Sequence, residues 1–253
     1  MSNNQSPQIL GTAPIGKLLV EYSLPAIIAM TVVSLYNVID SIFIGHGVGA
    51  MAIAGLAITF PLMNLIIAFC TLVGVGAATI SSIYMGQKDI QRATFVLHNA
   101  AILLLVNGLL VTIVTLIFLD PILLFFGASH ETLPYARDFM QVILIANPIA
   151  YLFVGLNNLM RATGYPKKAM LSSFLTVAVN VIVAPIFIFV LDWGIRGAAM
   201  ATAIAQLTGL VWVLAHFLNK KSFISFKKGC FKLHRRIIAS ILSIGMSPFL
   251  MNS

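Results

Sequence analysis

One carboxylate, Asp40, lies inside an otherwise apolar run of the chain. It belongs to the stretch LYNVIDSIFIG, residues 35–45, and the other six acidic residues lie near the edges of apolar segments or in loops. An aspartate at the centre of a membrane-spanning helix costs about 2.5 to 3.5 kcal/mol on insertion scales, so such residues usually face a cavity and bind something. Asn37 and Tyr36 precede Asp40 by three and four positions and share its helical face. This face has the groups to hydrogen-bond a protonated carboxyl or to surround a cation with oxygen atoms.

The position of Asp40 favours exchange chemistry over catalysis. Burial favours the protonated form of a carboxyl group, whereas a nearby cation favours the ionised form. A lone carboxylate in a cavity is therefore suited to exchange a proton or Na⁺ near neutral pH. The alternative is that Asp40 only caps a helix or reaches water at the outer surface, because its span ends about four residues later.

A second group of polar residues lies in the stretch TVAVNVIVAPIFIFVLDWGIRGAAMATAIAQ, residues 176–206. Asn180 is in the middle of one apolar run, and Pro185 removes a backbone hydrogen-bond donor from the same run. Thr202 and Gln206 are four positions apart on the next run and share a face. Single polar residues in lipid usually hydrogen-bond one helix to another. Taken together, these side chains can also complete the surroundings of the buried carboxylate.

The elements that must position these residues are long apolar segments. Of 253 residues 60% are hydrophobic and 9% are charged, whereas a soluble domain carries about 25% charged residues. Residues 22–44 contain Asp40 as their only charged residue, and five more segments contain none, namely 51–85, 93–119, 139–160, 169–191 and 197–219. About 20 apolar residues cross the hydrocarbon core, where backbone amides need internal partners. The sequence thus predicts an all-α, multi-pass membrane protein whose residues 15–219 form a compact six-helix bundle.

Three shorter segments flank this bundle. Residues 1–14 form a polar N-terminal tail, residues 220–236 a basic cytoplasmic linker, and residues 237–253 the start of a seventh apolar helix. Pro248 in that helix corresponds in position to Pro25 in the first span, which suggests that a second lobe begins here. Membrane transporters are often built from two such repeats. We therefore expect a truncated transporter whose second lobe is missing. The outer loop, residues 120–138, has room for a small surface helix.

The formal net charge of +8 does not indicate a nucleic-acid partner, because its distribution follows the membrane. Thirteen of the 15 Lys and Arg residues lie in segments that share one side, namely 1–21, 86–92, 161–168 and 220–236. The outer loops hold only Arg137 and Arg196. Such an excess of positive charge marks the cytoplasmic side, so we expect a cytoplasmic N-terminus.

The sequence contains no motif of an enzyme or a metal site. It has no HExxH, no GxSxG and no second carboxylate beside the first within the apolar runs, and its glycine-rich stretches lack the Lys-Ser/Thr of a phosphate-binding loop. Cys70 and Cys230 fall in different environments, so neither a disulfide nor a metal site is implied. We expect no enzymatic activity, no metal and no cofactor other than a coupling ion, H⁺ or Na⁺.

Four stretches together make the sequence resemble the multidrug and toxic compound extrusion (MATE) transporters. They are LPAIIAMTVVSLYNVIDSIFIGHGVGAMAIAGLAITFP (24–61), GVGAATISSIYMGQKDIQRA (74–93), GLNNLMRATGYPKKAM (155–170) and NVIVAPIFIFVLDWGIRGAAMATAIAQ (180–206). The resemblance implies an antiporter of the bacterial plasma membrane that exports organic, often cationic or amphipathic compounds in exchange for H⁺ or Na⁺. It also implies two six-helix lobes.

The resemblance extends to individual residues. Asp40 matches the acidic residue of the family's first helix, and Asn180 and Thr202 match polar positions of its amino-terminal cation site. Ala184 departs from the pattern, because many relatives have an acidic residue there, and a site with two carboxylates is therefore in doubt. Tyr36, Asn37 and Gln206 are expected to support the site, with hinges at Pro25, Gly45 and Pro185.

Two alternatives remain open. A lipid-linked oligosaccharide flippase of the wider superfamily would be expected to have more cationic residues inside its cavity than these spans contain. A non-transporting membrane scaffold would use the basic linker to recruit partners. Replacing Asp40 with Asn distinguishes a scaffold from an antiporter. A scaffold should keep its partner binding without the carboxylate, whereas an antiporter should lose ion-coupled efflux.

Overall fold

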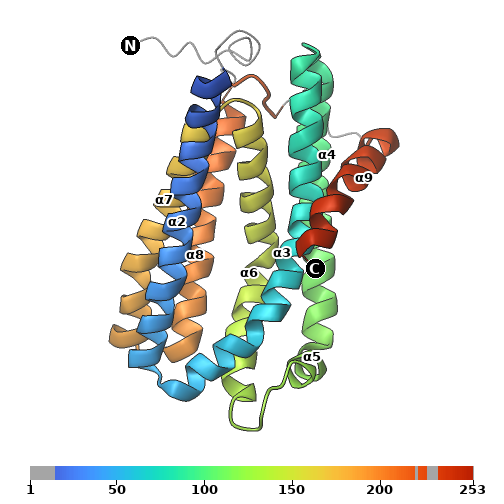
Figure 1. The fold of residues 1–253 in the computed structure, drawn as a ribbon. Helices are drawn as coiled ribbons and strands as arrows, with labels where there is room; N and C mark the ends of the chain where they lie inside the picture. The colour runs from blue at the N-terminus through green and yellow to red at the C-terminus, as the bar shows by residue number, and fades with distance from the viewer. Residues whose placement is uncertain (1–14, 220–221, 227–232, 253) are drawn as a thin grey trace.

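In the computed structural model, the chain folds into helices and their connections (Figure 1). The structure describes residues 15–219, 222–226 and 233–252, and it contains no strand within these ranges. The predicted polar tail and much of the basic linker, including Cys230, lie outside the described residues.

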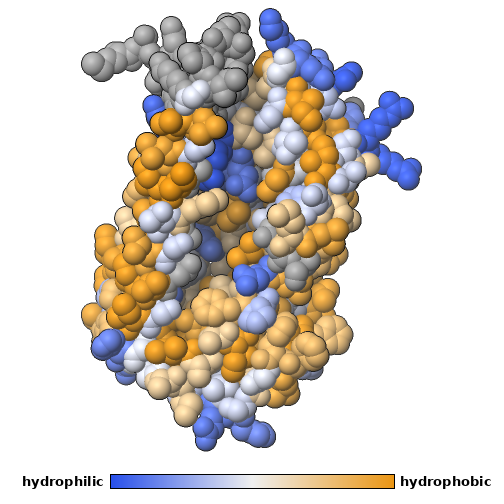
Figure 2. Space-filling model, viewed as in Figure 1, coloured by the Kyte–Doolittle hydropathy of each residue, from blue (hydrophilic) through white to orange (hydrophobic). Residues whose placement is uncertain are grey.

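Six long helices confirm the six predicted membrane spans. They are α2 (Ile15–Gly47), α3 (Ala50–Gly86), α4 (Ile90–Ile117), α6 (Leu133–Ala162), α7 (Pro166–Pro185) and α8 (Gly194–Leu218). Each contains a stretch that is long and apolar enough to cross a membrane, α7 together with the π-helix η1 (Ile186–Val190). Figure 2 shows the matching surface, in which apolar residues cover the middle of the molecule and hydrophilic residues gather toward its two ends.

Two short elements complete the bundle. Helix α5 (Leu119–Phe125) occupies the outer loop, where the sequence left room for a surface helix, and buries Leu119 and Leu123 against its neighbours. Helix α9 (Arg235–Asn252) is the seventh apolar segment and packs mainly against α3. Before α9, the short segment 222–226 lies against the bundle, since Ile224 is buried and the backbone N–H of Phe226 donates to the carbonyl of Phe217.

The long helices form two groups. Helices α2, α7 and α8 lie together on the left of Figure 1, and the upper part of α3 lies with α4 on the right. Helix α6 stands between them and contacts α3, α4 and α8 extensively. Between the two sides, the space-filling view has a hollow whose walls include hydrophilic residues (Figure 2). This hollow is the part of the lobe in which polar side chains have room to act.

We call α3, α4 and α6 together the frame. Its packing depends on small residues and on a hydrogen bond that replaces the one a proline cannot make. A Cβ on Gly74 would lie 3.1 Å from the Cα of Gly155, so the backbones of α3 and α6 approach closely there. In α6, Pro148 has no N–H to donate to the carbonyl of Leu144. The hydroxyl of Thr112 on α4 donates to that carbonyl instead, at 3.0 Å. The helix therefore continues through Pro148 without a buried, unpaired carbonyl.

Pro185 changes the type of its helix, as its missing donor suggests. Helix α7 ends at this residue and the backbone continues as η1, in which the N–H of Leu191 donates to the carbonyl of Ile186, five residues earlier, at 3.0 Å. Single π-helical turns of this kind are frequent at functional sites. By contrast, α2 stays helical through Pro25 and up to Gly47, so hinges at Pro25 and Gly45 stay predictions.

Candidate cation-coupling site

Three polar side chains from three helices meet inside the group formed by α2, α7 and α8. The hydroxyl oxygens of Tyr36 and Thr202 are 3.0 Å apart, and the side-chain amide of Asn180 donates to the Thr202 hydroxyl at 3.1 Å and approaches the Tyr36 hydroxyl at 3.5 Å. The Thr202 hydroxyl in turn donates to the carbonyl of Ala198 at 3.2 Å. The structure thus brings together three residues that the sequence separates by up to 166 positions. We call these three the polar triad.

Asp40 lies one helical turn beyond Tyr36, toward the outer end of α2. Its side chain is buried, with 8% of the residue exposed, and its Oδ1 atom has no hydrogen-bond partner among the residues the structure describes. A buried oxygen without a donor is unfavourable. An oxygen in this position needs a proton, a cation or a donor that moves in from elsewhere. Tyr36, the triad residue on α2, lies one helical turn from Asp40, which is about 6 Å along the helix.

Two alanines lie at about the level of Asp40 along the helix axes. Helices α2 and α7 are parallel, because Gly47 at the end of α2 meets Ile188 just after α7. One turn beyond Asn180 on α7 therefore brings Ala184 to the level of Asp40. On the antiparallel α8, one turn back from Thr202 brings Ala198 to that level. Both alanines are fully buried, and neither side chain carries an oxygen atom.

Two other predicted site residues are not shown to join the triad. Gln206 lies one turn from Thr202 on α8 and is half-buried, and it takes no part in the hydrogen bonds of the triad. The side chain of Asn37 lies outside the described part of the chain. Their supporting roles stay predictions.

The predicted inner segment 161–168 begins on a helix. Arg161 lies in the last turn of α6 and is half-buried. It follows Asn157 by four positions, so the two side chains share a face of α6.

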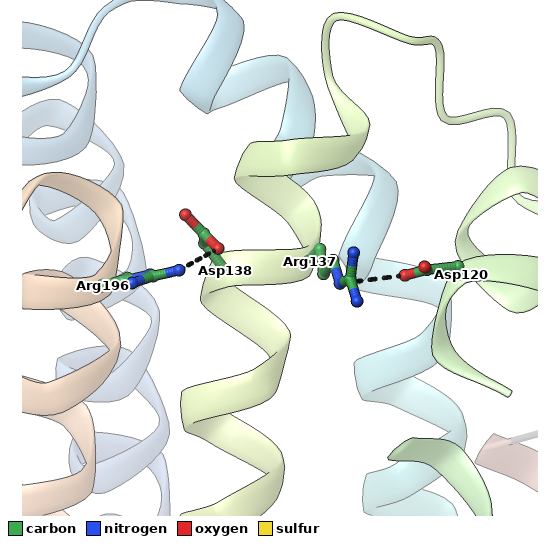
Figure 3. A network of polar contacts seen from close by, with 4 residues as sticks. All are labelled: Asp120, Arg137, Asp138 and Arg196. Atoms are coloured by element: carbon green, nitrogen blue, oxygen red, sulfur yellow. Dashed lines mark hydrogen bonds and ion pairs between the residues drawn. The ribbon is translucent and has the colours of Figure 1, made fainter. Parts of the chain in front are cut away.

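The end of the lobe that the sequence predicts to lie outside carries two ion pairs, which Figure 3 shows in one row across three helices. Arg137 of α6 pairs with Asp120 of α5 at 3.4 Å, and Arg196 of α8 pairs with Asp138 of α6 at 2.7 Å. All four side chains are at least one-third exposed, so each pair contributes at most about 1 kcal/mol to stability. The two arginines of the predicted outer loops are thus paired.

No group of three or more His, Cys, Asp or Glu side chains that could hold a metal ion occurs among residues 15–219, 222–226 and 233–252.

Comparisons with known proteins agree with this architecture. The MatE family model matches residues 25–186, more than half of the chain. The chain is 30% identical to the multidrug export protein MepA of Staphylococcus aureus (strain NCTC 8325 / PS 47), over 95% of this chain and 53% of MepA. It is 32% identical to MepA of Staphylococcus haemolyticus (strain JCSC1435), over 93% of this chain and 52% of that protein.

A solved structure gives the same result. The outward-facing conformation of a multidrug resistance MATE family transporter of the MOP superfamily matches with a TM-score of 0.91 and 29% identity, over 100% of this chain and 56% of that chain. The chain spans about half the length of the curated relatives it matches. The six spans, the family model and these likenesses lead to one conclusion: the chain belongs to the MatE family of membrane transporters.

Proposed function

We propose that this chain is the amino-terminal lobe of a secondary antiporter that exports organic, often cationic or amphipathic compounds in exchange for a cation. The observation that carries the proposal is the buried carboxylate of Asp40, whose Oδ1 has no donor within the described residues and which lies one turn from the polar triad. Membership of the MatE family supports the export of small molecules. In this proposal a second six-helix lobe completes the transporter, since the matched relatives are about twice as long.

The proposed coupling uses the ionisation of Asp40 to move α2. An ionised carboxylate needs hydrogen-bond donors, and the polar triad holds two of them one turn inward, on Tyr36 and Asn180. Drawing these donors toward Asp40 removes them from Thr202, which links α2 and α7 to α8. A proton or cation at Asp40 removes that need and lets the triad re-form. The bound compound is released if it binds one arrangement of α2 more tightly than the other, because only unequal affinity shifts such an equilibrium.

We further propose that the coupling ion is a proton. Hard cations take about six oxygen ligands, whereas Ala184 and Ala198 supply none from their side chains at the level of Asp40. The hydroxyl oxygens of Tyr36 and Thr202 are already engaged with each other and with the amide of Asn180. A proton needs only the free carboxylate oxygen.

We propose the bacterial plasma membrane as the location, with the N-terminus of α2 on the cytoplasmic side. Lys88, between α3 and α4, Arg92, in the first turn of α4, and Lys167 and Lys168, at the start of α7, lie at the same end of the bundle as the start of α2. The excess of positive charge at this end supports that orientation.

The test is efflux of ethidium by membrane vesicles that carry the polypeptide containing this chain, under an imposed pH gradient or an imposed Na⁺ gradient. We expect efflux to follow the pH gradient and Asp40→Asn to reduce it at least tenfold, because an amide cannot exchange a proton. The matched control is Asp120→Asn, which changes an exposed, ion-paired carboxylate of α5 and should keep efflux within about twofold. Equal pumping by the parent and Asp40→Asn under both gradients contradicts the proposal, and efflux that follows only Na⁺ contradicts the proton.

A further inference from the structure

Arg161 is a half-buried cation whose charge no carboxylate balances in the described part of the chain. It lies one residue before the end of α6, and its Nη2 atom donates to the Oδ1 atom of Asn157 at 3.2 Å. Asn157 is itself fixed, because its amide donates to Ala169 at 3.0 Å and to Ser172 at 2.6 Å, both on α7. A guanidinium group has five N–H donors, so this anchored side chain retains donors for a ligand.

The helical positions around Arg161 show which way it faces. Asn157 marks the face of α6 toward α7. Asn158 marks the face toward α3, since its side-chain nitrogen lies 3.4 Å from where a Cβ of Gly74 would be. Arg161 follows these residues by four and three positions and so lies between the two faces. The hollow in Figure 2 runs between the side with α7 and the side with α3, and the helical position of Arg161 is directed between the same two sides.

The charge around this end of the hollow favours an anion. Lys88, Lys167 and Lys168 lie in the turns or first helical turns at the same end of the bundle. A partly desolvated cation without a counterion is costly. Arginine also matches the geometry of phosphate oxygens better than any other side chain, because its planar donors bind two oxygens at once.

The depth of Arg161 and the wall beside it indicate what kind of anion enters. Helix α6 has 30 residues, a length of about 45 Å, which equals a bilayer with its head groups. Arg161 is thus at the level of lipid phosphates. Val154 lies two turns deeper on the same face and is packed against the core, so the wall below the guanidinium is apolar. We propose that Arg161 binds the phosphate group of an anionic lipid that enters the hollow from the inner leaflet.

This lipid site is separate from the coupling site and does not depend on the proposed efflux. Asp40 lies seven residues from the outer end of α2 and Arg161 lies 28 residues from the outer end of α6. The two residues are therefore roughly 30 Å apart along the membrane normal. A compound of drug size cannot contact both. We expect Asp40→Asn to bind the lipid as well as the parent protein does. Lipid binding that persists where efflux is lost separates the lipid site from the proposed coupling site.

The test is native mass spectrometry of the purified polypeptide that contains this chain, in a neutral detergent with added phosphatidylglycerol. We expect Arg161→Gln to weaken binding about tenfold, and Arg161→Lys, which keeps the charge, to weaken it at most about threefold. The matched control is Arg92→Gln, because Arg92 is an exposed cation of the same end and is paired with Asp89 at 3.2 Å. It should leave binding unchanged. An equal loss in Arg161→Gln and Arg92→Gln overturns the proposal, since it shows attraction to surface charge alone.

Two further measurements use the unaltered protein, so that a variant that fails to fold does not decide the result. Diacylglycerol with the same acyl chains should not bind, because it lacks the phosphate, and inorganic phosphate at the same concentration should not displace the lipid. A photoreactive phosphatidylglycerol with its label near the head group should attach to the segment around residues 157–168. Binding of diacylglycerol, displacement by inorganic phosphate or attachment only to lipid-facing residues elsewhere overturns the proposal.

Discussion

The group of α2, α7 and α8 is held together differently from the frame of α3, α4 and α6. In the frame, side chains reach the backbone carbonyls of other helices. Asn107 donates to Phe69 at 2.8 Å and Tyr151 donates to Ile66 at 2.5 Å. In the other group, the triad joins α2 to α7 and α8 through side chains on both ends of each bond. Half of the membrane-spanning stretch of α6 is buried inside the protein, whereas only 19% of the membrane-spanning stretch of α2 is buried.

This difference indicates which part of the lobe moves. A backbone carbonyl stays where its helix places it, so a bond to it fixes two helices to each other. Bonds between side chains can be exchanged by rotation, and a helix with little buried surface loses little when it shifts. We infer that the frame stays rigid while α2 moves, which is the motion that coupling at Asp40 requires.

The largest effect is expected from filling a close backbone contact of the frame. Gly74→Leu places a side chain where the backbone of Gly155 lies 3.1 Å from the new Cβ. We expect a loss of about 3 kcal/mol in the free energy of unfolding, because backbone cannot move aside as a side chain can. Gly16→Leu on α2 is the matched control, since nothing lies within 4 Å of its Cβ position. Thermal unfolding in detergent measures both, and equal losses contradict a frame that is more tightly packed than α2.

Replacing tyrosine by phenylalanine should mainly lower stability at Tyr151 and mainly lower efflux at Tyr36. Tyr151→Phe removes a buried bond to the carbonyl of Ile66 and should lower the free energy of unfolding by about 1.5 kcal/mol. Tyr36→Phe removes the hydroxyl that joins α2 to Thr202. It should cost less than about 1 kcal/mol in stability but reduce proton-coupled efflux severalfold. If Tyr36→Phe destabilises the fold more than Tyr151→Phe, or leaves efflux intact, α2 is not the moving element.

The smallest effect tests the proline in the frame. Thr112→Val leaves the carbonyl of Leu144 without a donor, and we expect a loss of about 1 kcal/mol. Pro148→Ala restores a backbone N–H that can reach this carbonyl. In that background Thr112→Val should cost measurably less, which a double-mutant cycle of unfolding free energies detects. An unchanged cost shows that Thr112 acts through something other than the unpaired carbonyl.

The sequence alone predicted the membrane spans, because apolar length is a local property and lipid allows a spanning backbone little choice but a helix. It also singled out Asp40 and placed Tyr36 on the same face, since residues four apart on a helix are always neighbours. Asn180 and Thr202 were assigned to the site through the family resemblance. The pattern did not separate Thr202, which joins the triad, from Gln206, which shares its face but remains apart.

Tertiary structure decided which faces meet. The approach of α3 to α6 at Gly74, the bond from Thr112 to Leu144 and the bond from Tyr36 to Thr202 all depend on residues far apart in the chain. Helical periodicity orders side chains around one axis, but the rotation of that axis against its neighbours is set by the shapes packed between helices. For this reason the carboxylate and the alanine at position 184 were visible in the sequence, whereas the hydrogen bonds that join Tyr36, Asn180 and Thr202 were visible only in the fold.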